Sequence, residues 1–240
     1  MSFIIVMVAS CAFVAVAARS IKALPWLWYV IALGLDIVYA YGIVYDLPPS
    51  VLQVLSITVQ RGILAMALFV IVMYIGVFPR GSRVTRVLGP IRAELSIIAC
   101  ILASAHCVNY LDSYIGVFLT NIAVIGQNQF VSLVIALVLF AMLIVLGATS
   151  FKSIKRHMKA ATWKNIQRSS YVFFGLIYVH ALLVLYPSMV KGVGDALPTM
   201  VVSGVVFALY YVLRISRYLS DKREIQRGTT LSIARQEQDA

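Results

Sequence analysis

The feature that most constrains this 240-residue chain is a series of apolar runs, each close to the roughly 20 residues that a helix needs to cross a lipid bilayer. There are seven, and they cover approximately residues 2–18, 25–45, 55–78, 93–112, 130–150, 168–187 and 198–218. Transmembrane β-strands would be shorter and would alternate apolar with polar residues, which these runs do not. We therefore expect an all-α fold, a polytopic membrane helical bundle with seven transmembrane helices.

Composition indicates that lipid is the main solvent of the chain. Hydrophobic residues make up 62% of it and charged residues only 12%, whereas a soluble domain has about a quarter charged residues. The net charge of +11 could indicate nucleic acid, but the basic residues cluster in short connections between apolar runs. That distribution is typical of loops beside a membrane, so we expect the lipid bilayer as a partner and no nucleic acid.

The basic connections set the expected orientation. Lys and Arg residues follow the first run, occupy the connections PRGSRVTRVLGPIR and FKSIKRHMKAATWKN, and follow the seventh run, while the other connections hold one Lys and no Arg. This alternation predicts an N-terminus outside and a C-terminus in the cytoplasm, in a multi-pass protein of the cell's inner (plasma) membrane. The first run lacks a positively charged leading segment, so we interpret it as a retained helix rather than a cleaved signal peptide.

Two of the three histidines lie inside apolar runs, where an imidazole is costly unless something binds it. His106 comes 14 residues after Arg92 and His180 comes 12 residues after Arg168, which are helical rises of about 21 and 18 Å. Both runs leave the cytoplasm in the same direction, so the two imidazoles should lie at a similar height in the outer half of the bilayer. The third histidine, His157, is expected to be a solvated loop residue.

Two parallel histidines at one height could ligate one metal ion from opposite sides, and imidazole is a common axial ligand of haem iron. Small residues precede His106 on its helical face, namely Ala103, Ala99 and Ser96. A flat macrocycle needs such a groove, but close helix packing in membranes needs it too. Spacing alone therefore leaves open bis-histidine haem and two unrelated polar residues, each bonded to a neighbouring helix. Zinc is disfavoured because no third or fourth ligand occurs at that depth.

The segment IRAELSIIACILASAHCVNYL resembles the first haem-ligand helix of the ferric-reductase-like transmembrane family, with a serine where glycine is usual. The segment LGATSFKSIKRHMKAATWKNIQRSSYVFFGLIYVH resembles the second ligand helix and the loop before it. The likeness covers roughly residues 26–218 and is nearest to the haem-binding membrane subunits of periplasmic methionine sulfoxide reductase systems. The matching positions are Arg92, Leu95, His106, Thr149, Ser150, Trp163, Tyr171 and His180.

This resemblance implies haem b with His106 and His180 as its axial ligands. Two-haem members place a further histidine 13 or 14 residues before each of these, where this chain has Gln167, Ala93 and Arg92. None of these is a usual haem ligand, so the resemblance implies one haem per chain. It also implies three regions: an additional N-terminal transmembrane helix over 1–24, a six-helix ferric-reductase-like haem-binding domain over 25–219, and a polar cytoplasmic tail over 220–240.

Two charged residues inside apolar runs are further candidates. Arg61 lies about 17 residues from the cytoplasmic end of its run, and the resemblance makes it a haem-propionate partner, since guanidinium and carboxylate pair well. The alternative is an arginine whose side chain extends to the outer surface. Asp36 lies near the middle of the second run, where a structural hydrogen bond to Tyr39 or another helix is favoured over a role in carrying protons.

These observations predict a membrane b-type cytochrome, an electron-transfer subunit of an oxidoreductase system without catalytic residues of its own. The expected electron donor is a quinol or a flavin such as FMN, and the expected acceptor is an extracytoplasmic reductase or another redox protein. One alternative is a transporter or permease that uses Asp36, Arg61 and the membrane histidines, although the sequence shows no evident pair of broken helices. Another is a structural membrane anchor for a reductase complex.

Overall fold

The computed structural model describes residues 2–45, 47–120 and 125–238, and these residues are almost entirely helical, with no strand among them. The expected all-α class is therefore confirmed. The long helices are α1 (Ser2–Ala23), α2 (Pro25–Val44), α6 (Arg92–Thr120), α7 (Gln127–Ser150), α10 (Ser170–Val190) and α11 (Ala196–Gln238). The shorter elements are α3 (Pro49–Leu55), the π-helical turn η1 (Ser56–Gln60), α4 (Ile63–Ile75), α5 (Arg83–Leu88), the 3₁₀ turn η2 (Gly89–Ile91), α8 (Lys152–Lys155) and α9 (Ala160–Arg168).

The long apolar helices make the chain a multi-pass membrane protein. Within the described residues, five helical stretches are long and apolar enough to cross a bilayer, and one bent pair of helices would make a sixth. The 20-residue helix α2 occupies the second predicted run but is not among these stretches, so the number of seven spans stays a prediction. The five stretches are Phe3–Ala23, Arg83–Val117, Gln127–Ser150, Ala160–Val190 and Ala196–Glu224.

The third predicted run, 55–78, is not one continuous helix. It is part of the bent pair, in which α3 and η1 meet α4 at an angle of 42°. The bend falls at Gly62, whose φ of 65° lies in the left-handed region that glycine adopts without a steric penalty. The run 55–78, which the sequence predicted as one spanning helix, is therefore divided in two, because one glycine suffices to end one helix and start the next.

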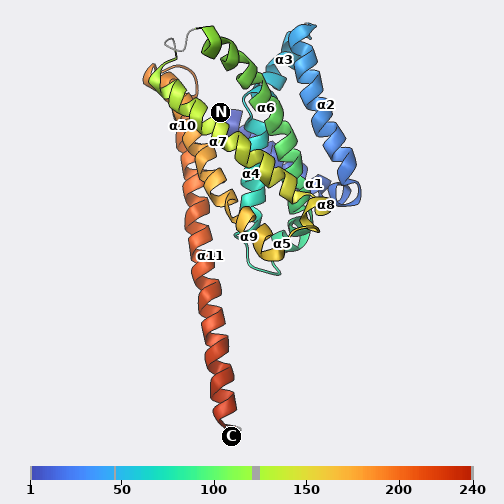
Figure 1. Cartoon of the computed structure of the whole chain (residues 1–240), viewed down its shortest axis with the longest axis vertical. Helices are drawn as coiled ribbons and strands as arrows, with labels where there is room; N and C mark the ends of the chain where they lie inside the picture. The colour runs from blue at the N-terminus through green and yellow to red at the C-terminus, as the bar shows by residue number, and fades with distance from the viewer. Residues whose placement is uncertain (1, 46, 121–124, 239–240) are drawn as a thin grey trace.

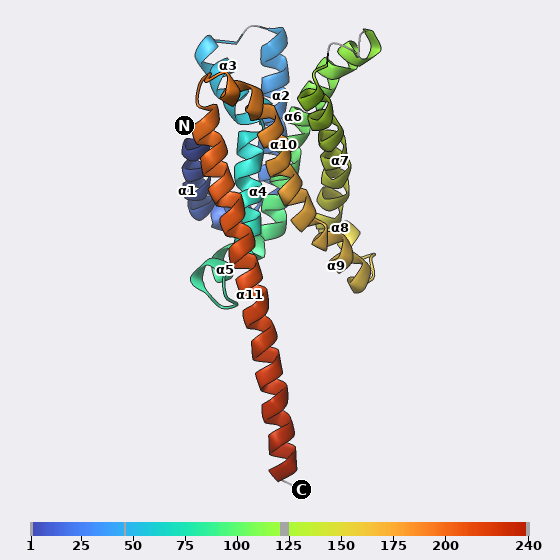
Figure 2. The ribbon, with the colours of Figure 1, turned by 90° about the vertical axis from the view of Figure 1, so that its left-hand side faces the viewer.

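The helices pack around α4, which lies between α1 and α6, while α6 also packs against α2 and α7, and α10 packs against α7 and α11. Figures 1 and 2 show α5, α8 and α9 together at one end of the bundle, where the connections 76–92 and 151–169 lie. We call this end the basic end. Beyond it α11 continues as a single helix through residues 220–238, the region predicted as a polar tail.

A buried carboxylate joins three elements at the basic end. Glu94, on α6, is 6% exposed, and it accepts a 2.5 Å hydrogen bond from the hydroxyl of Tyr29 on α2. Lys152 of α8 lies 3.0 Å from the same carboxylate, although its own side chain is 83% exposed. The tyrosine hydroxyl and the lysine together give this buried charge the partners that it needs away from water.

Candidate functional site

The structure brings the two membrane histidines together. His106 of α6 and His180 of α10 have ring centroids 6.5 Å apart, with ring planes at 80° to each other. Both side chains are half-buried. The two histidines are separated by 73 residues in the sequence. Their closeness in space agrees with the expectation that both imidazoles lie at one height in the bundle.

Each imidazole has a backbone carbonyl beside its Nδ1. His106 Nδ1 lies 2.6 Å from the carbonyl oxygen of Gln60, and His180 Nδ1 lies 3.2 Å from the carbonyl oxygen and 3.0 Å from Oγ of Ser132. A carbonyl oxygen can only accept, so a neutral His106 carries its hydrogen on Nδ1, and the contacts of His180 with Ser132 are compatible with the same tautomer. Each Nε2 then keeps its lone pair, which is the state in which a neutral histidine binds a metal.

The distance between the ring centroids can be compared with two arrangements: a hydrogen bond between the two imidazoles, and two imidazoles bound to one metal ion. Two imidazoles hydrogen-bonded to each other have centroids no more than about 5.1 Å apart, for an N···N distance of about 2.9 Å. Two imidazoles on opposite sides of one metal ion have centroids about 6.3 Å apart, since each bond is about 2.0–2.1 Å long. The observed 6.5 Å is longer than the first value and close to the second.

The broken span holds His106 in place. Gly62 lies so close to the imidazole that an added Cβ would be 3.2 Å from His106 Cγ and 3.3 Å from Nδ1. The same break carries the carbonyl of Gln60, which binds Nδ1, and Tyr110 packs on the ring with centroids 4.9 Å apart. The bend at Gly62 thus places two backbone contacts on one histidine, which a straight helix could not do.

The ligand set suits haem better than a bare metal ion. Within the described residues there is no group of three or more His, Cys, Asp and Glu that could hold a metal. Two imidazoles alone leave most positions of an ion unfilled, whereas a porphyrin supplies its own four equatorial nitrogens and needs only two axial ligands from the protein. The donor chemistry and the ring separation therefore fit haem, with His106 and His180 as the residues that would hold it.

The two charged candidates differ in burial: Arg61 is exposed and Asp36 is buried. Arg61 is exposed at the bend, beside Gln60 and Gly62 in sequence and within electrostatic range of Tyr110. Asp36 is 8% exposed, and its Oδ1 has no hydrogen-bond partner among the described residues. Among the described residues, the structural hydrogen bond that the sequence favoured for Asp36 is not found at this oxygen.

The positions where a second pair of ligands would lie are occupied by other interactions. Gln167 donates to Thr149 Oγ1 at 2.9 Å, which ties α9 to α7. Arg92 donates from Nε to the carbonyl oxygen of Val72 at 3.0 Å. His157 is exposed in the connection after α8, as expected for a solvated loop residue.

Sequence reasoning missed three residues of the site: Gln60, Gly62 and Ser132. Gly62 gave a signal, because a glycine next to an arginine within an apolar run favours a break. Ser132 is one of the few hydroxyl residues in the apolar part of α7 and is 6% exposed. The carbonyl of Gln60 gave no signal, since every residue has one.

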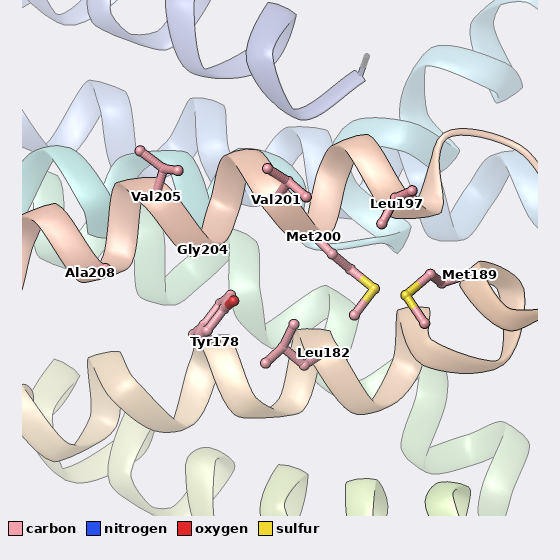
Figure 3. A pocket seen from close by; sticks show the side chains of 9 residues that line it. All are labelled: Tyr178, Leu182, Met189, Leu197, Met200, Val201, Gly204, Val205 and Ala208. Carbon is pink, nitrogen blue, oxygen red and sulfur yellow. The ribbon is translucent and has the colours of Figure 1, made fainter.

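A groove between α10 and α11 lies near the site, with a volume of about 460 Å³. Figure 3 shows Tyr178 and Leu182 of α10 facing this groove, with Met189 and Met200 near one end of it. Residues two positions apart on a helix point about 200° apart, so this groove and His180 lie on opposite faces of α10. Its lining is almost wholly apolar.

Comparisons with known proteins give little information on function. No family model matches the chain, and no solved structure matches it. A similar protein is an uncharacterized protein of Treponema pallidum (strain Nichols), 34% identical over 157 residues. The matched region is 65% of this chain and 43% of that protein, so the chain spans less than half of its length.

Proposed function

We propose that this chain is a membrane b-type cytochrome similar to the ferric-reductase-like family, with one haem b held by His106 and His180. The observation that carries the proposal is the histidine pair: two imidazoles on separate helices, with ring centroids 6.5 Å apart and each with Nδ1 beside a backbone carbonyl. Haem, when bound, supplies a one-electron redox centre without an open coordination position, which favours electron transfer over substrate binding at the metal.

The residues around the pair have separate roles in this proposal. The carbonyls of Gln60 and Ser132 orient the imidazoles and keep Nε2 unprotonated. Gly62 lets the backbone approach His106 closely. Arg61, which follows Gln60 at the bend, is proposed as the partner of a propionate.

The proposed electron donor is a quinol from the bilayer, with a flavin such as FMN as the second choice. The groove between α10 and α11 supports a quinol, because its lining is apolar and because His180 lies on the opposite face of α10, about the 10 Å width of one helix away. The proposed acceptor is an extracytoplasmic reductase or other redox protein. The basic residues at one end of the bundle support an orientation in the plasma membrane with that end in the cytoplasm.

A visible absorption spectrum of the purified full-length protein tests the proposal. A bis-histidine haem b should give a Soret band when oxidised and sharp α and β bands after reduction with dithionite. A protein that stays colourless after expression with excess haem precursor would rule the proposal out. A high-spin spectrum would show that one of the two imidazoles does not bind.

A transporter remains the second candidate, because two observations favour it. Asp36 is a buried carboxyl with an unpartnered oxygen, and the span formed by α3, η1 and α4 is broken. Buried carboxyls and broken helices occur in ion-coupled transporters. A colourless protein whose proteoliposomes show an ion or proton flux that Asp36→Asn abolishes would favour this candidate over the cytochrome.

A further inference from the structure

Two arginines meet at the basic end of the bundle, far from the histidine pair. Arg92 is the first residue of α6, and Arg214 is the first charged residue of α11 after an uncharged stretch. Both guanidinium groups converge on Gly76, the residue that ends α4. Arg214 Nη1 donates to the carbonyl oxygen of Gly76 at 3.0 Å, and an added Cβ on Gly76 would lie 3.4 Å from Arg92 Nη1.

Helix capping explains only part of this arrangement. The last carbonyls of a helix attract a cation, and Arg92 Nε accordingly donates to the carbonyl oxygen of Val72. The end of a helix carries only about half a negative charge, however, whereas two whole positive charges meet here. In the part of the chain that the structure describes, neither arginine forms an ion pair with a carboxylate.

The surroundings of the two arginines are rich in hydroxyl groups. Arg214 Nη2 donates to the hydroxyl of Tyr171 at 2.6 Å, and Tyr210 lies within electrostatic range of both guanidinium groups. Tyr211 donates to the carbonyl oxygen of Tyr171 at 2.7 Å, which fixes that side of the cluster. Several N–H groups remain available, since among the described residues hydrogen bonds use only Nε of Arg92 and the two terminal nitrogens of Arg214.

We propose that Arg92 and Arg214 form a binding site for a phosphate group at the basic end of the bundle. Guanidinium groups bind phosphate oxygens through paired hydrogen bonds, and a bound phosphate would offset the repulsion between the two cations. Both arginines are half-buried rather than fully enclosed. Arg214 lies where the apolar part of α11 gives way to charged residues, and such a boundary is the depth at which an anionic phospholipid holds its phosphate.

The test measures retention of phosphatidylglycerol on the detergent-purified full-length protein by native mass spectrometry. Wild type should keep one phosphatidylglycerol per chain. Diacylglycerol, which lacks the phosphate, should not be retained at the same lipid concentration. Arg92→Gln and Arg214→Gln should each weaken retention by about tenfold or more, the effect of losing one charge-assisted hydrogen bond. Arg168→Gln is the matched control, since Arg168 is exposed at the same end and bonds only to Asn165 among the described residues.

Two further comparisons identify the source of the phosphate and guard against misfolding. Inorganic phosphate that displaces the lipid at millimolar concentration would identify a soluble phosphate as the ligand, and no displacement would identify the lipid headgroup. If the glutamine variants fail to accumulate, Arg92→Lys and Arg214→Lys keep the charge but lose the paired geometry, and they should retain less lipid than wild type. Equal retention of phosphatidylglycerol and diacylglycerol, or equal loss in the Arg168→Gln control, would overturn the proposal. No part of this test depends on haem.

Discussion

Replacing Gly62 by alanine should disturb the histidine pair through backbone geometry alone. The left-handed φ of 65° costs a residue with a side chain about 1–2 kcal/mol. The new Cβ would also lie 3.2 Å from His106 Cγ, closer than an ordinary carbon contact, so the ring must shift by a few tenths of an ångström. A shift that breaks the bond from Nδ1 to the carbonyl of Gln60 adds about 0.5–1.5 kcal/mol.

Gly81 provides a matched control for this substitution. Its φ is 83°, but an added Cβ would have no atom within 4 Å. Gly81→Ala should therefore lower the thermal unfolding temperature by a few degrees, about as much as the backbone strain alone predicts, and leave the low-spin haem spectrum unchanged. Gly62→Ala should lower the unfolding temperature further and reduce the haem content or the low-spin fraction.

Haem content, spectrum and unfolding temperature of the two variants and wild type would be measured side by side in the same detergent. If Gly62→Ala matched Gly81→Ala in all three measurements, the close contact between Gly62 and His106 would have no part in holding the ligand. The role given to the broken span would then be wrong.

Three other substitutions test further parts of the account. His106→Ala and His180→Ala should each abolish the low-spin haem spectrum while His157→Ala keeps it, and equal haem content in all three would refute the ligand assignment. Arg61→Gln should loosen the haem and lower its midpoint potential by tens of millivolts in order of magnitude, because a nearby cation favours the reduced iron; a redox titration indistinguishable from wild type would make this arginine a surface residue only. Glu94→Gln should cost about 1–3 kcal/mol of stability, since its tyrosine and lysine partners lose a buried charge, and an unchanged unfolding temperature would contradict this.

Much of the helical framework could be predicted from the sequence because its signals are local. Apolar runs of membrane-spanning length predicted the long helices. The rise per residue of a helix predicted that His106 and His180 lie at one height, and in the structure their ring centroids are 6.5 Å apart. The break at Gly62 was missed because a single glycine in an apolar run is compatible with a continuous helix. The arginine beside it was a local signal for a break, but it was interpreted only as a candidate haem partner or surface residue.

The partners of the histidines could not be predicted, for a related reason. The contact of His180 with Ser132 joins residues 48 positions apart, and the contact of His106 with Gln60 joins residues 46 apart. Such contacts depend on how α7 and the broken span pack against the ligand helices. For Asp36 the sequence predicted a hydrogen bond that the described part of the structure does not show at Oδ1. The packing around α2 leaves its Oδ1 without a partner among the described residues.

The central claim is that His106 and His180 bind one haem from opposite sides, and the haem count per chain tests it most directly. A pyridine haemochrome assay on the purified wild-type protein, with chain concentration from amino-acid analysis, should give one haem b per chain. The positions that would supply a second pair of ligands are occupied by Gln167, which bonds to Thr149, and by Arg92, which bonds to Val72. A count near two would show that another ligand pair exists, and a count near zero after expression with excess haem precursor would contradict the account altogether.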